Sequence, residues 1–402
     1  MIIGVPGETA SDEERVALVP PVAAELIADG HDIYVGAGVG ETADWSDEAY
    51  ESVGCTVLGN REDVFEQADI ILQVRALGAT DDASLDTYRE NQLVVGLLGP
   101  YDIDDATLAE LAERNVSAFA LELIPRISRA QSMDALSSMA SLGGYKATLV
   151  AATELPKMFP LEMTAAGTIR PAEVFIIGAG VAGLKAISTA ERLGASVRAY
   201  DIRLEVKQEV ESLGADFVEL DLETEGAGDE EGYAIEMGEE FLEQQRKKLT
   251  RVVADSDVVI TTAAIPGRPA PELVTTEMIE NMDAGSVIID LSAESGGNCE
   301  PTVADERIDH DGVTILGPTD LPSTVTHTAS EQFANNMKNF LQNMVVDGTF
   351  TIDTTDEIVD STLLTHDGEI RNPHIQDEPP NTDDSGDKAD KEASETEGTD
   401  AE

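Results

Sequence analysis

The 402-residue chain has little of several residue types, and each shortage excludes a class of protein. It holds two cysteines and five histidines, without a Cys-X-X-Cys or Cys/His cluster, so neither a disulfide framework nor a metal site is predicted. Only 25 residues are basic against 80 acidic ones, which argues against nucleic acid or an anionic membrane surface as a partner. No apolar run reaches the roughly 18 residues of a membrane span, and the amino terminus has no signal-peptide pattern. We therefore expect a soluble protein of a reducing compartment.

The net charge of −55 is too large to come from one end of the chain. Residues 375–402 contain 11 acidic residues, two lysines and almost nothing apolar, which is typical of a disordered tail. Most of the acidity therefore belongs to the folded surface. We interpret it as adaptation to high salt, because a Debye length of about 3 Å at molar ionic strength mutes self-repulsion. An ordinary, very acidic protein is the alternative.

Short apolar runs alternate with amphipathic stretches up to about Leu123, and the same rhythm restarts near Val174. Such alternation predicts parallel strands with crossover helices. The stretch 134–155 is rich in Ala, Ser, Met and Leu and predicts a long joining helix, and the pattern near 328–345 predicts a helix that returns to the first unit. The expected fold is α/β, with two doubly wound Rossmann-like parallel-sheet domains joined by the long helix and followed by a poorly structured acidic tail. The expected boundaries are 1–135 with about 326–350, then 136–325, then 351–402.

A glycine-rich turn in VFIIGAGVAGL follows a buried strand and opens a helix. Gly178 suits the tight turn, Gly180 the close approach of a pyrophosphate, and Gly183 the packing of helix on strand. The next strand ends in Asp201, where a carboxylate binds the ribose 2'-OH of NAD and repels the 2'-phosphate of NADP. NAD is therefore favoured, although Arg203 follows closely. The predicted contacts here are Gly178, Ala179, Gly180, Val181, Gly183, Asp201, Ile202 and Arg203.

A second glycine cluster, at Gly36, Gly38 and Gly40, also follows a predicted strand. Its third glycine comes one position early, and Glu41 and Thr42 replace an apolar helix start. We interpret this cluster as an ordinary turn.

The segment RISRAQSMDALSS, residues 126–138, follows the last strand of the first unit. Ligands of open α/β sheets bind at the carboxyl ends of strands, and this segment offers two arginines, Gln131, Asp134 and several hydroxyls. Capping of the next helix by Ser132 or Asp134, with solvated arginines, is an equally open reading.

Long stretches of the chain, including RISRAQSMDALSSMASLGGYKA, GYAIEMGEEF, TTAAIPGRPAPELVT and GSVIIDLSAESGGNCE, resemble the NAD(H)-binding first domain of proton-translocating NAD(P) transhydrogenase. The similarity runs from Met1 to about Phe350. It implies a nicotinamide-holding loop that contains Ile127 and Ser128 and whose orienting residues are Arg126, Gln131, Asp134 and Ser137.

The resemblance also implies a mobile lid and two further cofactor-lining positions. The lid's Gly-Tyr-Ala core falls on Gly232, Tyr233 and Ala234, followed by Ile235 where relatives usually carry Lys. The cofactor-lining positions are Gln245 and Ala264, the latter in place of a more common Leu.

The implied reaction is direct hydride transfer between NADH bound here and NADP⁺ on a partner domain or subunit, coupled to proton movement by a membrane partner. It needs positioning and no acid or base. The resemblance further implies NADP(H)-binding and membrane-spanning partner subunits, a cytoplasmic location at the inner face of the membrane, and a homodimer in which PLEMTAAGTIRPAEV is the exchanged hairpin.

Two other functions stay open. Alanine dehydrogenase resembles this family, but its catalytic His would fall at Gly99 and its substrate Lys near Gln73 and Arg75, beside a retained Arg15. A non-catalytic NAD sensor, in which closure of the lid reports cofactor occupancy, is the other alternative.

Overall fold

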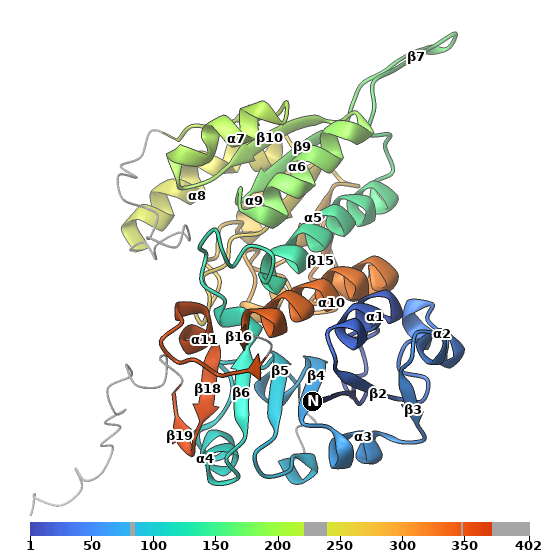
Figure 1. The fold of residues 1–402 in the computed structure, drawn as a ribbon. Coiled ribbons are helices and arrows are strands. Elements are labelled where there is room, and N and C mark those ends of the chain that lie inside the picture. The colour runs from blue at the N-terminus through green and yellow to red at the C-terminus, as the bar shows by residue number, and fades with distance from the viewer. Residues whose placement is uncertain (81–84, 221–238, 347–348, 372–402) are drawn as a thin grey trace, which may run out of the picture.

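The structure is a computed structural model, and it describes residues 1–80, 85–220, 239–346 and 349–371. The chain forms two lobes, each built around one large sheet, with two long helices running between them (Figure 1). The predicted α/β class with two Rossmann-like sheets is confirmed.

The first sheet has eight strands in the order β19-β18-β6-β5-β4-β1-β2-β3. Strands β1 to β6 are all parallel to their neighbours, and β18 and β19 add an antiparallel edge. Its strands are β1 (Ile2–Val5), β2 (Asp32–Gly36), β3 (Thr56–Leu58), β4 (Ile70–Arg75), β5 (Leu93–Leu97), β6 (Ser117–Ala120), β18 (Leu363–His366) and β19 (Glu369–Ile370). Its helices are α1 (Pro20–Ala28), α2 (Asp47–Ser52), α3 (Arg61–Gln67), α4 (Asp105–Glu113) and α11 (Glu357–Thr362).

The second sheet has seven strands in the order β11-β10-β9-β12-β13-β15-β14, antiparallel only between β14 and β15. Its strands are β9 (Glu173–Ile177), β10 (Ser196–Tyr200), β11 (Asp216–Phe217), β12 (Val258–Thr261), β13 (Val287–Asp290), β14 (Arg307–His310) and β15 (Val313–Leu316). Its helices are α6 (Val181–Leu193), α7 (Lys207–Ser212), α8 (Glu239–Ala254) and α9 (Thr276–Ile279). In both sheets the first strand lies beside the fourth, which is the switch point where open α/β folds bind ligands.

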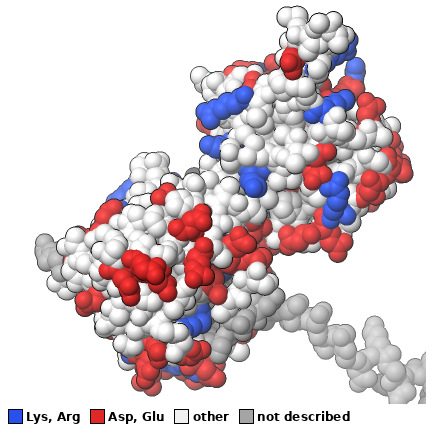
Figure 2. Space-filling view, turned by 90° about the vertical axis from the view of Figure 1, so that its right-hand side faces the viewer, with Lys and Arg blue, Asp and Glu red and all other residues white. Residues whose placement is uncertain are grey.

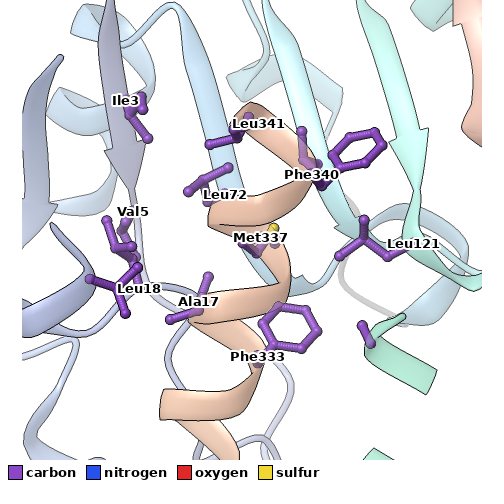
Figure 3. Packing of buried hydrophobic residues seen from close by; sticks show 14 of the residues in the cluster. Ile3, Val5, Ala17, Leu18, Leu72, Leu121, Phe333, Met337, Phe340 and Leu341 are labelled. Atoms are coloured by element: carbon purple, nitrogen blue, oxygen red, sulfur yellow. The ribbon is translucent and has the colours of Figure 1, made fainter. Parts of the chain in front are cut away.

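Two long helices, α5 (Ala135–Glu154) and α10 (Thr326–Asn343), hold the domains together. The first turns of α5 pack in the core of the first domain, while Ala147 and Ala151 pack in the core of the second. Helix α10 lies on the first sheet, where Phe333, Met337 and Phe340 fill the space beside Ile3, Val5 and Leu72 (Figure 3). The helical period in TASEQFANNMKNFLQN places these apolar side chains on one face.

The assignment of residues 351–402 to a poorly structured tail was wrong for its first segment. Helix α11 begins at the N-cap Asp356, whose carboxylate accepts from the amides of Ile358 and Val359. Strand β18 then pairs with β6 and buries Leu363 and Leu364 completely. These apolar pairs lie between acidic residues, so the mean composition hid them; residues 372–402 lie outside the described ranges.

Two hairpins complete the structure. One, formed by β7 (Glu162–Thr164) and β8 (Gly167–Ile169), projects from the second domain into solvent (Figure 1). The other, formed by β16 (Val345–Val346) and β17 (Thr349–Phe350), follows α10.

Candidate functional site

The glycine-rich turn lies between β9 and α6, at the switch point of the second sheet. Gly178 has φ +97°, and a Cβ there would lie 2.5 Å from the Thr262 hydroxyl. A Cβ at Gly183 would collide with the Gly178 carbonyl oxygen. At Gly180 no other described atom would come within 4 Å of a Cβ, so the turn is open on that side.

Gly180 is also the N-cap residue of α6, and no described side chain caps that end of the helix. The first N–H groups of α6 and the positive end of the helix dipole are therefore available to an anion. Val181, the first residue of the helix, is 39% exposed beside this opening. The turn can hold a phosphate, as its sequence predicts.

Asp201 follows β10 and is anchored to the glycine turn. Its Oδ2 atom accepts from the amide of Ala179 at 2.7 Å, and its side chain is 5% exposed. Arg203 donates to the same carboxylate through its backbone N at 2.8 Å, Nε at 2.9 Å and Nη2 at 2.8 Å. The hydrogen bond to Asp201 raises the pKa of the Arg203 guanidinium. The pair gives the end of β10 a rigid, internally neutralised polar edge, with Ile202 between the two residues.

Gln245 and Tyr200 form a second polar contact beside β10. Gln245 is 3% exposed on α8, and its Nε2 atom donates to the Tyr200 hydroxyl at 3.0 Å. Its Oε1 atom finds no partner among the described residues. Burial raises the pKa of Tyr200 to about 12, so this hydroxyl stays protonated.

The segment before α5 lies at the other side of the molecule's centre, in the first domain. Asp134 caps α5: its Oδ1 atom accepts from the Ser137 amide at 2.8 Å and its Oδ2 atom from the Ser137 hydroxyl at 2.5 Å. Arg126, Ser128 and Gln131 are exposed, whereas Ile127 packs against the core of the first domain. The capping interpretation of Asp134 is therefore present in the structure, and it leaves the polar groups of the segment facing outward.

Helix α5 connects this segment to the glycine turn. A Cβ at Gly144 would collide with the carbonyl of Ala182, the second residue of α6, and the Thr148 hydroxyl donates to the Ala186 carbonyl at 3.3 Å. At about 1.5 Å of rise per residue, the Asp134 end of α5 lies roughly 15 Å from this crossing. One rigid helix thus fixes the spacing between the two predicted halves of the site.

Ala264 lies in the loop after β12, and a network that sequence reasoning missed supports this loop. Asn298 is fully buried; its Nδ2 atom donates to the carbonyls of Ala263 and Pro271 at 2.7 and 2.8 Å, and its Oδ1 atom accepts from the Ala263 amide at 3.0 Å. Asp290, also fully buried, accepts from the Thr261 and Thr302 hydroxyls. Both residues follow β12 or β13 at the carboxyl edge of the sheet, and that position is the signal that could have identified them.

The cysteines are unsuited to nucleophilic chemistry. Burial raises the pKa of Cys55 to about 11 and that of Cys299 to about 12, so both are neutral thiols. Three possible metal ligands, Glu280, His310 and Asp311, lie within 4.8 Å of one another near the β14–β15 turn. They are largely exposed, and exposed acidic groups commonly gather without a metal.

The predicted lid residues Gly232, Tyr233 and Ala234 lie outside the described residues.

The crevice of the first domain is filled with its own ion pairs. The Glu8 carboxylate accepts from the amides of Val74 and Arg75 at 2.7 and 3.0 Å, across the switch point between β1 and β4. Arg15 is bound by Glu13 and, at 2.9 Å, by Asp320. The Gly36, Gly38 and Gly40 cluster leads into a short 3₁₀ helix (Glu41–Ala43) and not into an α-helix start of the dinucleotide type.

Comparison with known proteins follows the same division. A family model described as "Alanine dehydrogenase/PNT, N-terminal domain" matches residues 4–143, and one described as "Alanine dehydrogenase/PNT, C-terminal domain" matches residues 147–373. The chain belongs to this family. The first of the separate polypeptides that make up NAD(P) transhydrogenase subunit alpha in Rhodospirillum rubrum is 42% identical over 385 residues, which cover 93% of this chain and 99% of that protein. The protein of the same name from Rickettsia prowazekii is also 42% identical, over 91% of this chain and 94% of its own length.

The structural comparison agrees with the sequence comparison. The crystal structure of transhydrogenase from Sinorhizobium meliloti has 38% sequence identity and a TM-score of 0.80, covering 93% of this chain and all of that one. Alanine dehydrogenase of Mycolicibacterium smegmatis is 26% identical over 92% of this chain. The resemblance to transhydrogenase drawn from the sequence is confirmed, and within the family the chain is a transhydrogenase alpha subunit homologue.

No helix within the described ranges combines the length and the apolar character needed to cross a bilayer.

Proposed function

We propose that this chain binds NAD(H) at the carboxyl end of β9 and exchanges hydride with NADP(H) held by a partner subunit of a transhydrogenase. The observation that carries the proposal is the uncapped start of α6 beside Gly180, with Asp201 fixed to the same turn through Ala179. The first N–H groups of a helix bind a pyrophosphate, and a carboxylate at the next strand end binds ribose hydroxyls. Relatives at 42% identity are transhydrogenase alpha subunits, which supports the same conclusion.

NAD(H) is preferred over NADP(H) because Asp201 would meet the 2'-phosphate. Arg203 does not reverse this preference, since its guanidinium is already bound to Asp201 by two side-chain hydrogen bonds. An Arg that recognises a 2'-phosphate has to be free to turn toward it.

The chain's own residues orient the nicotinamide and transfer no protons. Bound NADH supplies a hydride from C4, and the exposed Arg126 and Gln131, with Asp134 and Ser137 at the start of α5, hold the ring and its amide toward the partner. Holding two rings at about 3 to 3.5 Å in register gives most of the acceleration available to such a reaction. Ile127, Ser128, Gln245 and Ala264 complete the proposed cofactor contacts, and Gly232, Tyr233 and Ala234 form the proposed lid.

An amino-acid dehydrogenase is disfavoured by the crevice of the first domain. Arg15, the residue retained from the alanine dehydrogenase pattern, is bound by Glu13 and Asp320 and is only 4% exposed. Gly99 stands where the catalytic His would be, and Arg75 contacts Asp12 at 3.3 Å. A substrate carboxylate would have to displace these internal carboxylates.

The decisive experiment mixes the full chain with an NADP-binding transhydrogenase domain and follows hydride exchange from NADPH to an NAD⁺ analogue. We expect exchange that depends on both proteins. Alanine-dependent reduction of NAD⁺ without the partner would instead indicate a dehydrogenase. NADH binding with neither reaction would indicate the non-catalytic sensor.

The partners we propose are an NADP(H)-binding subunit and a membrane-spanning, proton-conducting subunit. They place this chain in the cytoplasm, peripheral to the inner face of the cell membrane. Co-purification from membranes, lost when the membrane subunit is deleted, checks this arrangement.

We also propose a homodimer built through the β7–β8 hairpin. The hairpin projects from the second domain and exposes apolar side chains, with Leu161 57% and Met163 79% accessible (Figure 1). Exposed apolar residues on a projecting element need a covering surface, and an identical hairpin of a second copy gives a closed, twofold arrangement. Met163→Asp should convert the dimer to monomer in sedimentation.

The acidic surface supports adaptation to high salt. Asp and Glu side chains cover both lobes of the face in Figure 2, with Lys and Arg fewer and mostly on the upper lobe. At low ionic strength their mutual repulsion destabilises the compact state. Full cooperative folding without added salt would contradict this interpretation.

A further inference from the structure

The loop after β12 ends in a tight turn formed by Ile265, Pro266, Gly267 and Arg268. The Arg268 amide donates to the Ile265 carbonyl at 3.2 Å, and Gly267 has φ +69°. Proline at the second position and a left-handed glycine at the third are typical of a type II turn. The sequence therefore fixes the tip of the loop that carries the proposed cofactor contact Ala264.

The base of this loop is equally well held. Asn298 binds both backbone groups of Ala263, and the Thr262 hydroxyl donates to the Gly178 carbonyl at 3.2 Å. Loop base and glycine turn thus form one rigid unit in the second domain. Any force on the tip at Gly267 is transmitted to Ala264.

Tyr101 of the first domain meets this tip. It follows β5 in a turn in which Asp102 and Ile103 donate to the Gly99 carbonyl at 3.0 and 2.9 Å. The Gly99 amide donates to Glu122 at 2.7 Å, and a Cβ at Gly78 would lie 2.6 Å from the Gly99 oxygen. The turn beneath Tyr101 is therefore tightly packed and cannot yield easily.

The contact between Tyr101 and Gly267 leaves no space for a side chain on the loop. A Cβ at Gly267 would lie 2.5 Å from Cδ1 and 2.9 Å from Cε1 of Tyr101. The ring lies directly on the turn, although Tyr101 is 38% exposed elsewhere. An aromatic ring of one domain thus rests on the cofactor loop of the other.

We propose that Tyr101 is a positioning residue of the NAD(H) site. Its ring sets the distance between the two domains at the Gly267 turn, and so sets where Ala264 lies relative to the Arg126–Ser137 segment. The inference rests on the proposed function, because it concerns the placement of the nicotinamide between these two regions. Displacement of about 1 Å at such a site can cost up to about 100-fold in rate.

The test compares Tyr101→Ala with Tyr101→Phe in the full chain. We expect the Ala variant to lower kcat for hydride exchange by roughly 10-fold while KM for NADH changes less than about threefold, because the ring orients more than it binds. The Phe variant retains the ring and should stay near wild type. A Phe variant as slow as the Ala variant would overturn the ring contact as the cause.

A second readout does not depend on activity. Trp45, the single tryptophan, lies in the first domain, stacked on His327 at 4.9 Å, so energy transfer from Trp45 to bound NADH reports the separation of the domains. Tyr101→Ala should reduce this transfer, and Gly267→Ala, which displaces the ring from the other side, should reduce it as well. Wild-type transfer and kcat in both variants would overturn the inference. Failure of the wild-type chain to bind NADH or exchange hydride would instead defeat the proposed function.

Discussion

The two domains share one strand order, yet their switch points are built in opposite ways. In the second domain the first strand, β9, leads into glycines and an uncapped helix end, which leaves N–H groups open. In the first domain the equivalent strand, β1, leads into Glu8, whose carboxylate already accepts from two amides at the end of β4. Sheet topology creates a crevice in both, and the first residues after the strand determine whether a ligand or the protein itself fills it.

The difference is electrostatic as well as steric. Glu8 brings an acidic group to the place where a dinucleotide would bring its phosphates, and Glu13 and Asp320 surround Arg15 nearby. An anion entering the first crevice would meet carboxylates, whereas one at the second would meet amide N–H groups and a helix dipole. The first domain therefore serves as a platform, and the second as the binding site.

The strongest test of this comparison blocks the open side of the glycine turn. Gly180→Val should weaken NADH binding by at least about 100-fold, since its side chain would occupy the space reserved for the pyrophosphate. Thermal stability should change little, because no described atom lies within 4 Å of the new Cβ. Fluorescence titration with NADH, paired with thermal unfolding, measures both.

Gly59→Val is the matched control in the first domain. No described atom would lie within 4 Å of its Cβ either. It should leave NADH binding unchanged. Equal losses in both variants would mean that the second switch point is not the site.

The next test separates capping from orientation at the start of α5. Asp134→Ala removes an N-cap, which costs about 1 kcal/mol of stability, and should also slow hydride exchange roughly 30-fold with a smaller effect on NADH affinity. Asp104→Ala removes a cap with the same geometry from α4, where Asp104 accepts from the Thr107 amide at 2.8 Å. If both variants exchange hydride at the wild-type rate, Asp134 has only a capping role.

A smaller effect is expected at the ribose position. Asp201→Ser should weaken NADH binding about 10-fold, or roughly 1.4 kcal/mol, and should improve NADPH binding because Arg203 is released from its carboxylate. Titration of both dinucleotides on one preparation checks the change in preference. Unchanged affinity for NADH would show that other groups hold the ribose.

The smallest effect concerns pH and lies in the first domain. Burial raises the pKa of Glu122 to about 7 and likewise the pKa of Glu8 to about 7. A carboxyl whose pKa is raised on folding stabilises the fold below its ordinary value near 4.5 and loses that contribution as pH rises through 7. Glu122→Gln keeps an acceptor for the Gly99 amide and removes the charge, so it should reduce the fall in stability between pH 5 and 8 by about 1 kcal/mol, roughly 2–4 °C in Tm.

Glu300→Gln is the control for this titration in the second domain. Hydrogen bonding from Thr276 lowers the pKa of Glu300, so its contribution is present at neutral pH and lost on acidification. It should leave the alkaline loss as in the wild type. A Glu122→Gln variant with an unchanged pH profile would remove burial of that carboxyl as the cause.

How much was predictable depended on how local the cause was. The turn at Gly178 and the carboxylate of Asp201 were predictable because their spacing follows from one strand, one turn and one helix. The ordered segment 353–371 was missed, because its apolar pairs are too short to give a periodic pattern until β6 supplies a neighbour. Asn298 was also missed, since its value comes from three backbone groups that are distant in the chain.

The sequence by itself determined the fold class, the family and the glycine turn, because alternating apolar patterns and left-handed glycines act over a few residues. Only the tertiary structure decided which switch point stays open, that Arg203 turns onto Asp201, and that Tyr101 rests on Gly267. These arrangements depend on which side chains meet after two sheets and two long helices have packed. Burial and hydrogen-bond pairing between distant segments set them, and neither is encoded in any local stretch of the chain.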